Sequence, residues 1–158
     1  MREGAPLCRW QHRDLVLNVM PLDAKILGFS NRWYADALRT SANILLPSGL
    51  TIRAITAPYF LGPKIEAFRG RGQEDYFASH DLEDFVSVVE GRTSILQEVQ
   101  NASLELRAFI GEAVQTLLAA HRFRDALPGY LPPDTASQAR IGRLSRTLDE
   151  LSRLAPGS

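Results

Sequence analysis

Three charged side chains, Lys64, Asp81 and Asp84, have residue types and a spacing that could contact a phosphate group. A lysine offers a positive charge to phosphate oxygens, and nearby carboxylates either order that lysine or hold a bridging metal ion. Phosphate chemistry on magnesium needs two or three carboxylates from adjacent strands, and these two aspartates share one helical segment. The alternative is an ion pair between two helices, either Lys64 with Asp84 or Arg71 with Asp81.

Two short helices, joined by a polar connection that contains glycine, carry these residues within 57–92. Pro63 lacks a backbone N–H, which predicts that the first helix begins near Gly62 or is kinked there. The second helix is predicted over 81–90, with Ser79 as its N-cap. A period of 3.6 residues places four large apolar side chains on one face of it, with the two aspartates at the border. These apolar residues are Leu82, Phe85, Val86 and Val89.

This stretch resembles the distal segment of the nucleotidyltransferases related to the AbiEii/AbiGii toxins. In that family a helix with a K-x-x-A pattern precedes a helix with a D-x-x-D pattern, as KIEA precedes DLED here. Over about 4–154 the chain is similar to the second part of small bacterial nucleotidyltransferase-like proteins. The residues that carry the closest likeness are Pro58, Leu61, Lys64, Ala67, Arg71, Asp81 and Asp84.

The resemblance implies roles for six residues. Those that would serve catalysis, by contacting phosphate or ordering the site, are Lys64, Asp81 and Asp84. Those that would bind substrate are Arg71, His80 and Asn18. Asn18 stands where the family usually has an aspartate, its third metal-binding carboxylate. A hydrogen bond from Asn18 to a neighbouring loop is the alternative.

The family's first catalytic segment, a G-G or G-S turn followed by a D-x-D strand, has no counterpart in this sequence. The resemblance therefore implies a truncated or degenerate nucleotidyltransferase-like protein of the toxin–antitoxin type, inactive as given. No metal site is expected, and Mg²⁺ would serve only a complete active site. The alternative is a non-catalytic homologue that uses the fold to bind a protein or nucleotide partner, or to self-associate.

Candidate partners are predicted from the edge of the sheet and from the resemblance. A sheet without its first strands leaves an edge of unpaired backbone groups, which predicts a homodimer. The resemblance adds an NTP, RNA and an antitoxin protein as candidate partners.

Composition and charge favour an ordinary globular protein. The 158 residues include 18 basic and 18 acidic ones, so no overall positive charge attracts nucleic acid. The single cysteine, Cys8, cannot form an internal disulfide. No apolar run approaches the roughly 20 residues of a membrane helix. These features predict a cytoplasmic protein without membrane association.

The order of strand and helix patterns predicts an α+β fold in a single domain, 1–158. One small, mostly antiparallel sheet of about four strands is expected, with a hairpin at 47–49, followed by a helical C-terminal half. In the strand 14–20, apolar residues alternate onto both faces, which predicts that the sheet is covered on both sides. The resemblance implies that the whole is a truncated nucleotidyltransferase-like fold. Its strand-rich part, central helix pair and helical tail are 1–56, 57–92 and 93–154.

Two further groups have alternative interpretations. Trp33 and Tyr34 could stack on a nucleic-acid base, but an aromatic pair in a half-buried helix favours the core. Four arginines of the last helix could contact a phosphate backbone, although interspersed acidic residues favour a solvated face. They are Arg140, Arg143, Arg146 and Arg153.

Overall fold

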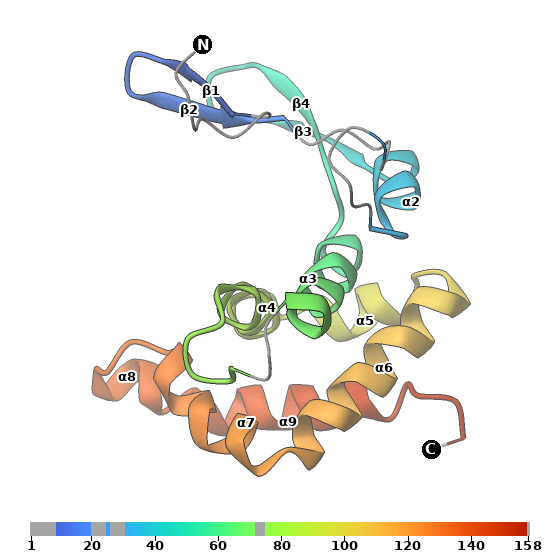
Figure 1. Cartoon of the computed structure of the whole chain (residues 1–158), viewed down its shortest axis with the longest axis vertical. Coiled ribbons are helices and arrows are strands. Elements are labelled where there is room, and N and C mark those ends of the chain that lie inside the picture. The colour runs from blue at the N-terminus through green and yellow to red at the C-terminus, as the bar shows by residue number, and fades with distance from the viewer. Residues whose placement is uncertain (1–8, 20–24, 26–30, 72–74, 158) are drawn as a thin grey trace.

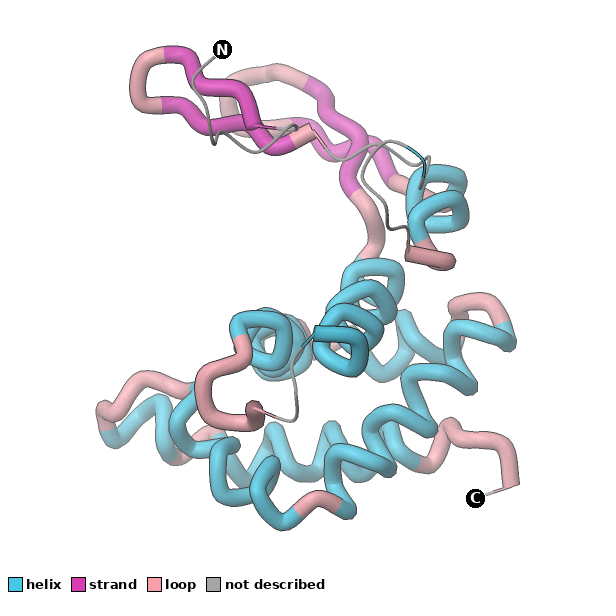
Figure 2. The backbone as a smooth tube through the Cα atoms, viewed as in Figure 1, coloured by secondary structure: helices cyan, strands magenta, loops and turns pink. Residues whose placement is uncertain are grey.

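The computed structural model describes residues 9–19, 25, 31–71 and 75–157, without the Arg71 side chain. Figures 1 and 2 show two regions of different kinds, a pair of β-hairpins and a body of packed helices. We call residues 9–19 and 42–55 the hairpin region, and residues 56–157 the helical body. The predicted α+β class is confirmed.

Four strands form two separate antiparallel hairpins, β1–β2 and β3–β4. The strands are β1 (Arg9–His12), β2 (Leu15–Asn18), β3 (Ala42–Leu45) and β4 (Thr51–Ala54). The prediction of one four-stranded sheet is therefore wrong for the described residues. Local turns fix each hairpin, as at Gly49 with φ +82°, whereas joining two hairpins needs long-range backbone pairing that a local pattern does not specify. The hairpin predicted at 47–49 is confirmed.

The β1–β2 hairpin exposes its apolar face. Opposite residues of an antiparallel pair share a face, so the pairs Trp10–Leu17 and His12–Leu15 lie on one side. Trp10, Leu15 and Leu17 are 67%, 74% and 62% exposed. The prediction that this strand is covered on both sides is wrong, because β2 pairs only with β1 and all four of its residues are exposed.

Eight α-helices and one 3-10 helix are found in the described part of the chain. They are α2 (Tyr34–Arg39), α3 (Ala57–Arg71), α4 (His80–Gly91), α5 (Ile95–Gln100), α6 (Leu104–Ala119), α7 (His121–Ala126), η1 (Leu127–Tyr130), α8 (Thr135–Gln138) and α9 (Ile141–Ser152). Side chains cap several of their N-termini; Ser79 Oγ and Ser103 Oγ accept hydrogen bonds at the starts of α4 and α6. None of these helices is long and apolar enough to cross a membrane.

Helix α3 begins at Ala57 and continues through Pro63, so the prediction of a start near Gly62 is wrong. The first turn is already closed by the hydrogen bond from Phe60 N–H to the Thr56 carbonyl, 3.0 Å. Burial of the α3 side chains offsets the cost of the proline, since packing supplies most helix stability in proteins. The most buried of these apolar side chains are Tyr59, Leu61, Ile65 and Phe68.

The core of the helical body lies where α3, α4, α6 and α9 meet (Figure 1). Phe85 of α4 and Leu148 of α9 are fully buried there. Trp33 is 2% exposed and packs on Phe109 of α6, with ring centroids 5.2 Å apart. The core interpretation of Trp33 is confirmed.

Candidate functional site

The structure brings together three of the six predicted site residues. Lys64 of α3 places Nζ 3.2 Å from Asp81 Oδ1 and 2.5 Å from Asp84 Oδ2, both on α4. The three side chains form an ion cluster across two neighbouring helices. We call Lys64, Asp81 and Asp84 the lysine cluster.

The start of α4 positions the carboxylates of this cluster. Ser79 Oγ accepts from the Leu82 N–H at 3.3 Å and fixes the first turn. Asp81 lies in that turn, where the positive end of the helix dipole favours a carboxylate. Asp81 is 8% exposed because the apolar face beside it packs into the core, whereas the Asp84 side chain is 49% exposed. The predicted apolar face, N-cap and border position are confirmed.

The electrostatics of the cluster favour a charged lysine. Burial by itself lowers the pKa of Lys64, but the hydrogen bonds and charges of Asp84 and Asp81 outweigh it and raise that pKa above 10.5. The ammonium group also lies 5.6 Å from the centre of the Phe60 ring, which adds a cation–π contact. The two carboxylates neutralise Lys64, so a phosphate would have to compete with Asp84 for it.

The other predicted site residues do not join Lys64. His80 has a 94% exposed side chain, and its Nδ1 lies 3.2 Å from Glu83 Oε2. Asn18 is in the β1–β2 hairpin, where its Oδ1 accepts from Arg9 Nε at 3.0 Å. Its partner is thus the adjacent strand and not a loop. The Arg71 side chain lies outside the described residues, so the Arg71–Asp81 alternative stays a prediction.

Among the described residues, no group of three or more His, Cys, Asp or Glu side chains is placed to hold a metal ion. Within the lysine cluster the two carboxylates converge on an ammonium group. What this arrangement can do is join α3 to α4.

Two of the four C-terminal arginines also join helices. Arg143 donates to Glu90 Oε1 at 2.6 Å and to the Glu90 carbonyl at 3.0 Å, and Arg140 Nε lies 3.3 Å from Glu90 Oε1. Glu90 ends α4, so these contacts fix α9 against α4. The interpretation of a merely solvated arginine face missed this contact, because Glu90 lies about 50 residues away in the sequence and gives no local signal.

An exposed apolar surface was also missed, because alternating apolar residues usually indicate a covered strand. Most of the exposed large apolar side chains among the described residues belong to the hairpin region. They are Trp10, Leu15, Val16, Leu17, Val19, Ile44, Leu45, Leu50, Ile52 and Ile55. A groove of about 410 Å³ continues this surface between the β3–β4 hairpin and helices α3 and α4. Apolar surface of this kind marks interaction sites in soluble proteins.

Comparison with known proteins found no counterpart: no protein-family model matches, and neither the curated proteins nor the solved structures include a match. The lysine cluster and the hairpin region are therefore the features that bear on function.

Proposed function

We propose that this chain is a non-catalytic binding protein that self-associates through its hairpin region. The observation that supports this proposal is the exposed apolar face formed by Trp10, Leu15 and Leu17 on a two-stranded sheet. The lysine cluster then has a structural role as a contact between α3 and α4. The resemblance to nucleotidyltransferases concerns ancestry in this proposal, and the chain is catalytically silent.

An isolated β-hairpin has little stability of its own. Two strands alone are marginally stable in water, and a further strand or a packed surface is needed for stability. In a two-stranded sheet every strand is also an edge, with unpaired N–H and C=O groups along its outer side. Packing against another protein surface would cover the apolar face, and a further strand beside the edge would pair its backbone groups.

A second copy of the chain fits these requirements. An antiparallel edge strand can pair with its own copy about a two-fold axis, because the same backbone pattern is presented by both. The face that would be buried carries His12 besides Trp10, Leu15 and Leu17, so no Asp, Glu, Lys or Arg side chain of it would meet its copy. Arg9 and Asn18 lie on the opposite face and bond each other.

Sedimentation velocity of the full chain at low to high micromolar concentration tests self-association. We expect a dimer for the parent and a monomer with unchanged helical circular dichroism for the double variant Leu15→Thr, Leu17→Thr. Threonine keeps the strand propensity and removes apolar area. The matched control is Leu104→Thr, which alters a 70% exposed leucine of the helical body and should remain dimeric. A monomeric parent, or a double variant that dimerises as well as the parent, would contradict the proposal.

A separate experiment tests catalytic silence. The chain is incubated with each labelled NTP, with Mg²⁺ or Mn²⁺, in the presence of bulk RNA. We expect no transfer of label to RNA or to the protein. Robust labelling that Asp81→Asn abolishes would overturn this part of the proposal and favour the nucleotidyltransferase, with its NTP, RNA and antitoxin partners.

A further inference from the structure

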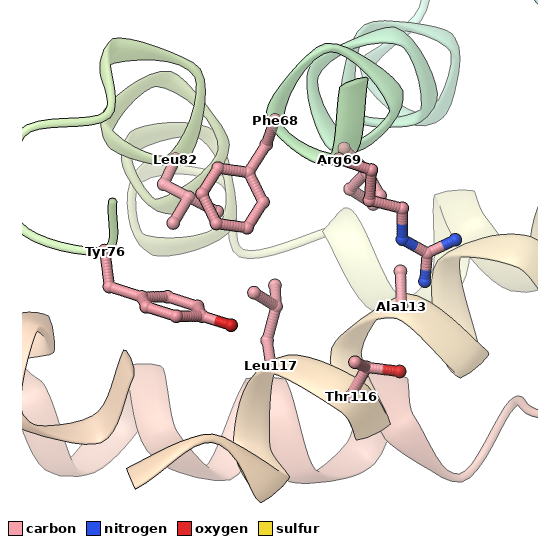
Figure 3. Close-up of a pocket in the computed structure, with 8 residues that line it drawn as sticks. Phe68, Arg69, Tyr76, Leu82, Ala113, Thr116 and Leu117 are labelled. Carbon is pink, nitrogen blue, oxygen red and sulfur yellow. The ribbon is translucent and has the colours of Figure 1, made fainter. Parts of the chain in front are cut away.

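A second hollow lies within the helical body, away from the hairpin region. It opens between α3, the segment that precedes α4, and α6, and has a volume of about 220 Å³ (Figure 3). Phe68, Leu82 and Leu117 form its apolar walls, each from a different helix. A cavity of about 150 Å³ lined by such side chains is large enough to bind benzene. This hollow therefore has room for an aromatic ring with a short substituent.

Tyr76 presents a hydroxyl group to this hollow. Figure 3 shows the hydroxyl pointing toward Leu117, and it has no hydrogen-bond partner among the described residues. Its position is fixed from behind, because the Tyr130 hydroxyl donates to the Tyr76 carbonyl at 2.5 Å. The Tyr76 ring also packs on Phe68 and Phe123, with centroids 5.4 and 6.4 Å away. A donor held in this way inside an apolar hollow is suited to a polar group on a ligand.

Arg69 brings a positive charge to the same hollow. Its guanidinium group is 5.1 Å from the centre of the Phe109 ring, which supports it from one side. No carboxylate of the described residues lies within ion-pair distance of it. The carboxylate of Asp75, next to Tyr76, instead accepts from the Phe77 and Ala78 N–H groups at 3.1 Å.

A second cation, Arg122, lies 5.9 Å from the centre of the Tyr76 ring. Like Arg69, it is exposed and has no carboxylate of the described residues within ion-pair distance. Lys64 and Arg143, by contrast, contact carboxylates at 2.5–3.2 Å and 2.6 Å. Of the two unpaired cations, Arg69 lines the hollow, and it has no counter-charge among the described residues.

We propose that this hollow binds a small aromatic carboxylate. The ring lies between Phe68, Leu82 and Leu117, and the carboxylate accepts hydrogen bonds from Arg69, whose guanidinium group lies beside Ala113 (Figure 3). Arginine matches a carboxylate because its planar group offers paired N–H donors. The apolar walls disfavour a fully hydrated anion such as free phosphate, since burying polar oxygens without donors is costly.

Titration of the full-length chain with phenylacetate, followed by amide NMR shifts, tests this assignment. We expect saturable binding that shifts the amides of Thr116 and Leu117, at a dissociation constant of about 0.1–1 mM for so small a ligand. The neutral isostere phenylacetamide should bind about tenfold more weakly, because it forfeits the charged hydrogen bonds. Equal affinity for the two compounds, or no saturation by phenylacetate, would overturn the proposal.

Arg69→Gln alters an exposed side chain, so it tests binding without disturbing the core. It should weaken phenylacetate binding about tenfold, as expected for a charged hydrogen bond. Arg146→Gln on α9 removes the same charge away from the hollow and should bind as the parent does. Parent-like affinity of the folded Arg69→Gln variant would also overturn the assignment.

Discussion

The helical body and the hairpin region differ in where they place their apolar side chains. In the helical body Phe85 and Leu148 are fully buried, whereas in the hairpin region Leu15 and Leu17 are 74% and 62% exposed. Both regions are rich in large apolar residues, so hydrophobic content alone does not reveal which region completes its own core. The difference shows that the helical body completes its own core, whereas the described hairpin residues leave large apolar side chains exposed.

Charges differ between the two regions in the same sense. In the helical body they connect different helices, as Lys64 does for α3 and α4 and Arg143 for α9 and α4. In the β1–β2 hairpin the hydrogen bond from Arg9 to Asn18 joins neighbouring strands. The ion pairs between helices fix how those helices pack against each other. The hydrogen bond between Arg9 and Asn18 stabilises only the hairpin in which both residues lie.

The largest expected effect compares one apolar truncation in each region. Phe85→Ala removes a fully buried ring and should lower the free energy of unfolding by about 3–5 kcal/mol. Leu17→Ala removes an exposed side chain and should change it by less than about 0.5 kcal/mol when both variants are measured below the concentration at which the parent self-associates. Chemical denaturation followed by circular dichroism measures both. A similar decrease in the free energy of unfolding for both variants would contradict the proposed difference between the helical body and the hairpin region.

A glycine in the helical body gives the next largest effect. A Cβ at Gly111 of α6 would lie 2.4 Å from the Ala155 nitrogen and 2.6 Å from the Leu154 carbonyl carbon. Because backbone atoms must then move, Gly111→Ala should destabilise the fold by about 1–3 kcal/mol.

The matched control is Gly70→Ala in α3, where a Cβ meets nothing within 4 Å. Gly70 lies in the last turn of α3, and alanine has a higher helix propensity than glycine, so this variant should be at least as stable as the parent. Thermal and chemical denaturation of both variants provide the measurement. A stabilised Gly111→Ala variant would show that the C-terminal turn does not dock against α6 as described.

Local patterns predicted much of the central helix pair. The cap at Ser79 and the apolar face that includes Phe85 depend on a capping residue and a period within one helix, so they are visible in the sequence. The ion pair between Lys64 and Asp84 joins two consecutive helices. The sequence offered it as one of two possible pairings, from the position of charges at the edge of a face.

The features that the sequence did not reveal depend on distant segments. In the sequence, Gly111 indicates only a weak point of a helix, although the chain at Ala155 packs against it. Glu90 gave no sign of its contact with Arg143 across 53 positions. The pairing of the two hairpins was likewise mispredicted, since apolar alternation in 14–20 specifies a strand but not its neighbour.

Within the helical body, the burial of each carboxylate of the lysine cluster should determine how much it contributes to the free energy of unfolding. Asp81→Asn alters an 8% exposed residue and should cost about 1–3 kcal/mol, because Lys64 loses its buried partner. Asp84→Asn alters a side chain that is 49% exposed and should cost less than about 1 kcal/mol. Chemical denaturation of the two variants measures this difference in stability.

Calorimetric titration of the parent and of Lys64→Ala with NTP tests whether the lysine cluster binds phosphate. NTP affinity that disappears in Lys64→Ala, with an unchanged denaturation midpoint, would show that it does.

The smallest expected effect concerns Tyr130, whose hydroxyl donates to the Tyr76 carbonyl. Burial, with the negative charges of Asp75 and Glu83, raises the pKa of Tyr130 from 10.0 to about 12. An unfolded tyrosine loses its proton near pH 10, while the folded protein keeps it until about pH 12. The folded state therefore binds more protons within that window, so the stability that is fully present below pH 10 is lost as the pH rises through it.

Tyr130→Phe tests whether Tyr130 causes this loss of stability at alkaline pH, and a hairpin-region variant serves as the control. The variant should lose about 0.5–1.5 kcal/mol at neutral pH, because a neutral hydrogen bond is removed. Its stability should also fall less steeply than that of the parent between pH 10 and 12. The raised pKa of Lys64 acts above 10.5 in the same direction and remains in the variant, so a residual slope is expected. Leu17→Thr in the hairpin region should retain the parent slope. If Tyr130→Phe kept that slope as well, the alkaline loss of stability would have to arise from groups other than Tyr130.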